Sequence, residues 1–280
     1  MTTPPPIITS PTNPRVKEAA RLRDAAARRA TGLTLVDGSR EIARGLAAGV
    51  EIVEVFVDAE GDADPARDAC IGALTARDVE LVPLARRPFE KIAFGSRNEG
   101  LVAVVRFAAR DLEEFQPAAD RPVLVVEGVE KPGNLGAILR TADAAGIAGV
   151  IACGSGTDPA NPAAIRASLG TIFSIPLAGV SSEAAIDWCS RHQRPVFAAM
   201  PDGALLWHEA PLAGGTAIVL GSEAHGLSGA WQQAAATGRL TLQTIRLPMG
   251  GVADSLNVAA TAAILAYEAL RQSEGGNRGG

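Results

Sequence analysis

Three loop segments in the second half of the chain concentrate the residue types that bind ligands. They are EGVEKPGNLGAILRTADAAG at 127–146, IVLGSEAHGLS at 218–228 and RLPMGGVADSLN at 246–257. Each is rich in glycine, asparagine, serine and charge, and each contains or follows an apolar run that reads as a strand. The third places a polar, glycine-bearing turn directly before an alanine-rich apolar helix, an arrangement that a simple hydrophobic core does not require. We therefore expect these loops to form a binding site.

The common nucleotide and metal motifs are absent from the sequence. No G-x-G-x-x-G of a nicotinamide-binding fold and no G-x-x-x-x-G-K-[ST] phosphate loop occurs. The three cysteines, Cys70, Cys153 and Cys189, are scattered, and the three histidines are isolated, so we expect neither disulfides nor a metal site.

The elements that position the three loops alternate between strands and helices. Apolar runs predict strands near 123–127, 149–152, 195–199, 217–221 and 242–246, and helices near 134–145, 182–192 and 256–272. This alternation predicts an α/β domain with a mostly parallel sheet. Ligands of such sheets bind at the carboxyl ends of the strands, where the three loops lie.

The helix after Asn134 leaves one arginine off its buried face. Its apolar stripe comprises Leu135, Ile138, Leu139 and Ala142, and Arg140 points roughly 150° away from the centre of that stripe. Taken alone, this pattern fits an ordinary exposed arginine on a helix whose N-cap is Asn134. The alternative is an arginine that points toward a partner and binds phosphate.

Read together, the three loops resemble the three signature motifs of the SpoU/TrmH family of RNA ribose 2'-O-methyltransferases, within the SPOUT class. The resemblance covers residues 122–272. The first motif, an asparagine before G-x-x-x-R, is matched by Asn134, Gly136 and Arg140. The second, G-x-E-x-x-G-L, is matched by Gly221, Glu223, Gly226 and Leu227. The third is matched by Leu247-Pro248-Met249 and Ser255-Leu256-Asn257.

The resemblance implies a fold, a cofactor and an assembly. The fold would be two α/β domains, of which the C-terminal one is a SPOUT-type, trefoil-knotted, mostly parallel sheet with flanking helices. S-adenosylmethionine would bind without a metal, and the chain would form a homodimer with the active site assembled between subunits. The cofactor-binding residues so implied are Gly221, Gly226, Leu247, Met249 and Leu256.

The same resemblance implies catalytic roles for Arg140, Asn134, Glu223, Ser255 and Asn257. A guanidinium keeps its proton to above pH ~12, so we expect Arg140 to hold the RNA phosphate beside the target ribose rather than to remove a proton. The other four would position Arg140 and the ribose through hydrogen bonds.

The first 107 residues form a second α/β unit that resembles, more weakly, the family's substrate-binding domain. Strands are expected near 33–36, 51–57, 79–84 and 101–107, and helices from about 13 and near 39–48, 65–76 and 87–93. Residues 1–12 are expected to be a flexible, proline-rich arm. The polar segment 108–121 would be a linker to the methyltransferase domain, 122–280.

Charge is unevenly distributed along the chain. The net charge is -5, yet residues 1–44 hold eight Arg and Lys against four Asp and Glu. This excess fits a solvated helix face or an RNA contact, for which the candidates are Arg15, Lys17, Arg21, Arg23, Arg28 and Arg29.

The chain also lacks a signal peptide and a membrane-spanning run, so we expect no membrane association and a cytoplasmic location.

Three functions remain open at this point. A full N-terminal α/β domain favours ribosomal RNA as the methylated substrate. A tRNA ribose 2'-O-methyltransferase and a non-catalytic RNA-binding or ribosome-assembly protein on the same fold are the alternatives.

Overall fold

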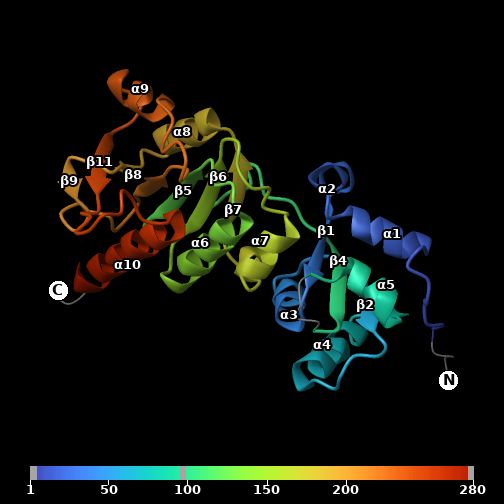
Figure 1. Cartoon of the computed structure of the whole chain (residues 1–280). Helices are drawn as coiled ribbons and strands as arrows, with labels where there is room; N and C mark the ends of the chain where they lie inside the picture. The colour runs from blue at the N-terminus through green and yellow to red at the C-terminus, as the bar shows by residue number, and fades with distance from the viewer. Residues whose placement is uncertain (1–4, 95–98, 277–280) are drawn as a thin grey trace. The chain divides into compact units, whose positions relative to one another are not determined.

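The computed structural model describes residues 5–94 and 99–276, which divide into two compact units (Figure 1). Unit 1 comprises residues 1–108 and 160–174, and unit 2 comprises residues 109–159 and 175–280. Within the described ranges no helix is long and apolar enough to cross a membrane.

Unit 1 is built on a four-stranded sheet in the order β1-β4-β2-β3. Strand β4 pairs antiparallel with β1 and β2, and β2 pairs parallel with β3. The strands are β1 (Leu33–Asp37), β2 (Ile52–Asp58), β3 (Leu81–Leu84) and β4 (Leu101–Arg106). The helices are α1 (Pro14–Arg21), α2 (Ala25–Thr31), α3 (Ser39–Ala47), α4 (Pro65–Thr75), α5 (Arg86–Ile92) and α7 (Pro162–Ala167), with the 3-10 helix η1 (Thr171–Phe173).

Unit 2 is built on a seven-stranded sheet in the order β7-β6-β5-β10-β8-β11-β9, and every neighbouring pair is parallel. The strands are β5 (Val123–Glu127), β6 (Gly149–Cys153), β7 (Leu177–Val180), β8 (Val196–Ala199), β9 (Leu205–Leu206), β10 (Ala217–Leu220) and β11 (Leu242–Arg246). The helices are α6 (Pro132–Ala144), α8 (Ser182–Arg191), α9 (Ala230–Ala236) and α10 (Val258–Gly276). The predicted mostly parallel α/β sheet is confirmed.

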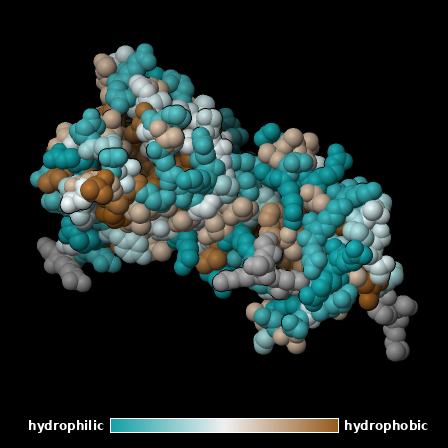
Figure 2. Space-filling model, in the orientation of Figure 1, coloured by the Kyte–Doolittle hydropathy of each residue, from teal (hydrophilic) through white to brown (hydrophobic). Residues whose placement is uncertain are grey.

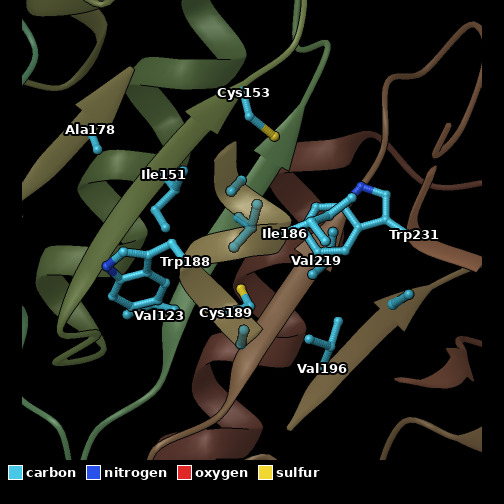
Figure 3. Packing of buried hydrophobic residues seen from close by; sticks show 14 of the residues in the cluster. Val123, Ile151, Cys153, Ala178, Ile186, Trp188, Cys189, Val196, Val219 and Trp231 are labelled. Carbon is cyan, nitrogen blue, oxygen red and sulfur yellow. The ribbon is translucent and has the colours of Figure 1, made fainter. Parts of the chain in front are cut away.

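Helices cover both faces of the unit 2 sheet (Figure 1). Alternate side chains of a strand point to opposite faces, so Val123 and Val125 pack with α8 and α9 while Leu124 and Val126 are buried on the other face. Figure 3 shows part of the core that contains Val123 and residues of α8 and α9. The indole rings of Trp188 and Trp231 lie there among aliphatic side chains.

The expected linker is part of unit 2 rather than a free connection. Arg110 N donates to Leu177 O, and Gly179 N donates back to Arg110 O, which attaches this segment to β7. Phe115 is buried and stacks edge-on against Trp188, with ring centroids 5.3 Å apart. An aromatic side chain in the core fixes the segment, because exposing it would cost about 1.5–3 kcal/mol.

Two further expectations about boundaries need correction. Residues 160–174 pack into unit 1, where Arg166 pairs with Asp37 at 3.0 Å and Phe173 stacks on Phe107, although we expected them in the C-terminal domain. The arm around Ile8 is attached rather than loose, because Ile8 N donates to Pro83 O and Ile8 O accepts from Ala85 N. Residues 1–4 lie outside the described part.

Candidate functional site

A cavity of about 330 Å³ lies in unit 2 where β8, β10 and β11 end and α10 begins. Its lining draws on the second and third loop segments and is largely apolar. All five residues expected to bind the cofactor are part of it: Gly221, Gly226, Leu247, Met249 and Leu256. Near the ends of β9 and β11, Figure 2 shows hydrophobic patches interrupting a mostly hydrophilic surface.

Gly221 is required by the close approach of two backbone segments. A Cβ added at Gly221 would lie 2.2 Å from the carbonyl carbon of Gly226, and Gly226 itself has a positive φ of 66°. Ser222 N donates to Gly226 O and Gly226 N donates to Ser222 O, so the loop closes on itself. These contacts leave the backbone of the loop on the wall of the cavity.

Gly250 and Gly251 do not have this role. Neither has a positive φ, and a Cβ on either would meet nothing within 4 Å. The third loop is exposed from Gly251 to Asn257.

Beside the cavity, Glu223 is held by two asparagine side chains from distant parts of the chain. Glu223 Oε1 accepts from Asn134 Nδ2 at 2.9 Å and from Asn257 Nδ2 at 2.6 Å. Asn257 Nδ2 also lies 3.2 Å from Asn134 Oδ1, which closes the triangle. Three of the five expected catalytic residues are therefore in direct contact.

Helix starts position both asparagines. Asn257 is the N-cap of α10, since its Oδ1 accepts from Ala259 N at 3.0 Å while its Nδ2 stays free for Glu223. Asn134 is not the N-cap of α6, as we had expected. The helix begins two residues earlier at Pro132, so the Asn134 side chain is available to Glu223.

Lys131 completes the surroundings of Glu223. Its Nζ lies 3.0 Å from Glu223 Oε2, and this hydrogen bond is the main cause of a lowered pKa of the Glu223 carboxyl. The Lys131 side chain is 73% exposed and Glu223 is 30% exposed, so the pair is at the surface and its strength depends on salt. Sequence reasoning missed Lys131, which lies just before α6 and outside the matched motif.

A second cavity, of about 310 Å³, adjoins the first. Glu223, Ser222 and Val258 line both, and Lys131 and Asn134 line the second with Gly128–Glu130 and Ala224. The Glu223 cluster therefore lies where the two cavities meet.

Arg140 and Ser255 lie outside this cluster. Ser255 lines the first cavity, and no hydrogen bond to it is recorded among the described residues. Arg140 is exposed on α6, six residues beyond Asn134 and about 120° away from it around the helix. It lines neither cavity, and the described part of the chain gives it no ion pair.

Glu127 is a second residue that the sequence reasoning passed over. Its carboxylate is buried at the end of β5 and accepts from Ser228 N at 2.8 Å and Ser228 Oγ at 2.9 Å. Ser228 ends the loop that carries Gly221, Glu223 and Gly226, so Glu127 anchors that loop to the sheet. A carboxylate ending an otherwise apolar strand was the available signal.

The six basic residues expected to contact RNA have different environments in unit 1. Arg28 is buried and donates to the carbonyls of Leu22 and Arg23, so it cannot reach a phosphate, and that expectation is wrong. Arg15 is paired with Glu54 and Glu80. Arg23 donates to Ala93 O and lies over the Phe94 ring. Lys17, Arg21 and Arg29 are exposed.

No group of three His, Cys, Asp or Glu in residues 5–94 and 99–276 is arranged to hold a metal ion. The three cysteines are buried, and burial raises the pKa of the Cys70 thiol to about 11 and that of Cys153 to about 12.

Comparison with known families matches both units. Residues 121–267 match the SpoU rRNA Methylase family, and residues 13–103 match the MRM3-like substrate binding domain. The chain is 33% identical over 205 residues to the 23S rRNA (uridine(2479)-2'-O)-methyltransferase of Streptomyces viridochromogenes, covering 70% of this chain and 69% of the relative. It is 30% identical over 232 residues to the 23S rRNA (guanosine-2'-O-)-methyltransferase RlmB of Vibrio parahaemolyticus, covering 78% and 90%.

Solved structures agree over nearly the full length. A crystal structure of an RNA 2'-O ribose methyltransferase superimposes with a TM-score of 0.83 at 40% identity, covering 96% of this chain and all of that one. The SpoU methyltransferase AviRb of Streptomyces viridochromogenes, in complex with AdoMet (S-adenosylmethionine), gives 0.81 at 27% identity, covering 94% and 98%.

Proposed function

Because the chain belongs to the SpoU rRNA methylase family, we propose that it transfers a methyl group from S-adenosylmethionine to a ribose 2'-oxygen of ribosomal RNA. The observation that carries this proposal is the pair of adjoining cavities with the Glu223 cluster between them. The relatives named above support ribosomal RNA as the substrate. We also propose a cytoplasmic location, where ribosomes would supply that substrate.

The first cavity fits the cofactor. Its volume of about 330 Å³ lies within the range of small-molecule sites, roughly 300–1,000 Å³. Leu247, Met249 and Leu256 offer an apolar bed for an adenine, and the Gly221–Gly226 backbone offers N–H and C=O groups to its polar edge. When bound there, S-adenosylmethionine supplies an electrophilic methyl group on a positively charged sulfur.

The residues around the second cavity orient the acceptor. A lowered pKa makes Glu223 a weak base, so we assign it to positioning rather than to proton removal. Glu223 holds Asn134 and Asn257, whose amides can hydrogen-bond a ribose, and Ser255 faces the cofactor side. Holding the hydroxyl in line with the methyl group reduces the entropy cost of the reaction.

Arg140 is assigned to the RNA phosphate, supplied across a homodimer. Its exposed position, away from the Glu223 cluster of its own chain, fits a residue that completes the site of a second copy. Its guanidinium can hold a phosphate with two hydrogen bonds and stabilise the negative charge that develops on the 2'-oxygen.

Unit 1 is assigned to RNA recognition, with Lys17, Arg21 and Arg29 as exposed cationic contacts. Arg15 and Arg23 would contribute only if RNA displaced their present partners.

The substitution Arg140→Ala tests the catalytic assignment. Methyl transfer to ribosomal RNA at saturating cofactor should fall by a factor of roughly 10² or more, the scale of losing one transition-state contact of about 3 kcal/mol. Cofactor affinity and unfolding temperature should stay unchanged. Arg140→Lys keeps the charge but not the planar fork, so it should rescue little.

A matched control is Arg191→Ala, which removes an exposed arginine from the last turn of α8. It should leave methyl transfer unchanged. Wild-type rates in Arg140→Ala would refute the assignment. Transfer to tRNA but not to ribosomal RNA would favour the tRNA alternative, and a wild-type chain that binds RNA without transferring methyl groups would favour a non-catalytic role.

A further inference from the structure

The charge of the first cavity is unbalanced. Its lining contains two carboxylates, Glu223 and Asp254, and no Lys, Arg or His among the described residues that form it. Arg246 is next to the lining in sequence, but its guanidinium donates to Gly203 O at 2.5 Å and Ala204 O at 3.0 Å, which holds its charge on those carbonyls.

Of the two carboxylates, only Glu223 is compensated. Its Oε2 lies 3.0 Å from Lys131 Nζ, and its Oε1 accepts from two amides. Asp254 lies in the exposed third loop, and among residues 5–94 and 99–276 no hydrogen bond or ion pair to its carboxylate is recorded. One uncompensated negative charge therefore remains on the cavity wall.

We propose that Asp254 determines the preference of the cavity for the methyl donor over its demethylated product. This inference rests on the proposed function, because it takes the cavity as the cofactor site. S-adenosylmethionine carries a sulfonium, an ammonium and a carboxylate, with a net charge of +1. Transfer of the methyl group leaves the sulfur with its electron pair as a neutral thioether, so S-adenosylhomocysteine has no net charge. Asp254 attracts the first and has little electrostatic attraction for the second.

The size of the effect follows from Coulomb's law. In a water-accessible cavity, solvent weakens the attraction between two unit charges but does not abolish it. Asp254 should therefore favour the donor over the product by on the order of 3- to 10-fold. The preference helps product release after each turnover, when the sulfur loses its charge.

The test is calorimetric titration of the full-length protein with S-adenosylmethionine and, separately, with S-adenosylhomocysteine. Asp254→Asn removes the charge and keeps the shape, and Asp254→Glu keeps the charge. The expected result is that Asp254→Asn loses affinity for the donor, with its affinity for the product nearly unchanged, so that the ratio of the two dissociation constants shifts by roughly 3- to 10-fold. Asp254→Glu should retain most of the wild-type ratio.

The control is Asp143→Asn, which removes the same charge from an exposed position on α6 that lines neither cavity. It should leave the ratio unchanged. Raising the salt concentration should reduce the wild-type ratio toward that of Asp254→Asn, because the cavity opens to solvent.

An unchanged ratio in Asp254→Asn would overturn this proposal while leaving the cofactor site intact. Equal losses for both ligands would also overturn it, because they would indicate a contact that does not depend on the sulfonium. If the wild-type protein bound neither ligand, the proposed function itself would fail, which is a different outcome.

Discussion

The two carboxylate oxygens of Glu223 have different hydrogen-bond partners. One of its oxygens accepts from Asn134 and Asn257, and the other faces Lys131. The motif spacing was enough to select Glu223 and the two asparagines. It could not select Lys131, because an exposed lysine before a helix is common and only the fold brings it to within 3.0 Å of the carboxylate.

Removing Lys131 should alter the pH dependence of activity. Lys131→Met takes away the main cause of the lowered Glu223 pKa, so this carboxyl should take up a proton at higher pH than in the wild type. The acidic limb of the pH–rate profile should move to higher pH. Lys91→Met is the matched control, because Lys91 donates to Pro11 O in unit 1 and should leave the profile in place. An unmoved limb in Lys131→Met would show that Glu223 ionisation does not limit the reaction.

In unit 1, Asp37 should make stability fall as pH rises. Burial raises its pKa to about 6 from 3.8, against the opposing hydrogen bond from Phe94 N and the charge of Arg166, while Glu41 and Glu99 raise it further. The folded state therefore binds a proton more tightly than the unfolded state, and it loses this stabilisation between about pH 4 and pH 6. The shift of roughly two pH units corresponds to at most about 3 kcal/mol.

The measurement is calorimetric unfolding of Asp37→Asn and wild type at several pH values. Asn does not titrate, so the stability of the variant relative to wild type should increase from pH 4 to pH 7, whatever the cost of losing the Arg166 pair. Asp68→Asn, at an exposed position of α4, should show no such trend. A difference that stays flat with pH for Asp37→Asn would contradict the assignment.

At the scale of elements, the loop of residues 221–228 is fixed at both ends. It leaves the sheet from β10 and is tied back to β5 by the two hydrogen bonds from Ser228 to Glu127. The sequence identified this loop through its motif and its preceding strand. The tie to Glu127 spans 101 residues, and such pairings follow from strand order, which sequence periodicity does not determine.

Glu127→Ala should loosen this loop and weaken cofactor binding. It removes both hydrogen bonds from Ser228 to a charged acceptor, which should cost about 1.5–3 kcal/mol of unfolding free energy. The loop lines the cofactor cavity, so part of this loss should appear in the free energy of cofactor binding. A change of about 1.4 kcal/mol would lower the affinity for S-adenosylmethionine roughly tenfold. Glu127→Gln keeps one acceptor oxygen, so it should lower the unfolding free energy and the cofactor affinity less than Glu127→Ala does. Calorimetric unfolding and ligand titration measure the two quantities.

Glu183→Ala serves as the control for a lost carboxylate in unit 2. Glu183 is 59% exposed and pairs with Arg239 at 2.7 Å, so its loss should cost no more than about 1 kcal/mol and leave cofactor binding alone. Cofactor affinity that is unchanged in Glu127→Ala would show that the loop is held by its own backbone bonds.

Most strands of both sheets were predictable because they are short apolar runs separated by turn residues, but β7 and α9 were not among the expected elements. Strand β9 has two residues and α7 has six, so each is too short for the hydrophobic periodicity of a strand or a helix to be recognised in the sequence. The assignment of residues 160–174 to unit 1 was likewise hidden, because it depends on the pairing of Arg166 with Asp37 and on the contact of Phe173 with Phe107.

For the whole molecule, the exposed apolar surface of unit 2 is consistent with the homodimer that we propose. Tyr267 on α10 is 52% exposed, Val252 is fully exposed and Leu256 is 39% exposed. Light scattering at micromolar concentration should give a mass near twice 28.7 kDa, and Tyr267→Arg should lower it. An obligate interface would bury on the order of 2,000 Å² or more. A mass near 28.7 kDa for the wild type would contradict the dimer and with it the placement of Arg140 in a shared site.

The central claim is that the methyl group goes to a ribose 2'-oxygen of ribosomal RNA. The most direct measurement is to incubate the protein with methyl-labelled S-adenosylmethionine and ribosomal RNA and then digest the RNA with alkali. Alkaline cleavage needs a free 2'-hydroxyl, so a 2'-O-methylated nucleotide stays joined to its 3' neighbour. If the protein methylates the ribose 2'-oxygen, the label appears in alkali-resistant dinucleotides. Label in mononucleotides would indicate methylation of a base, and an unlabelled RNA would indicate no transfer; either result would contradict the account.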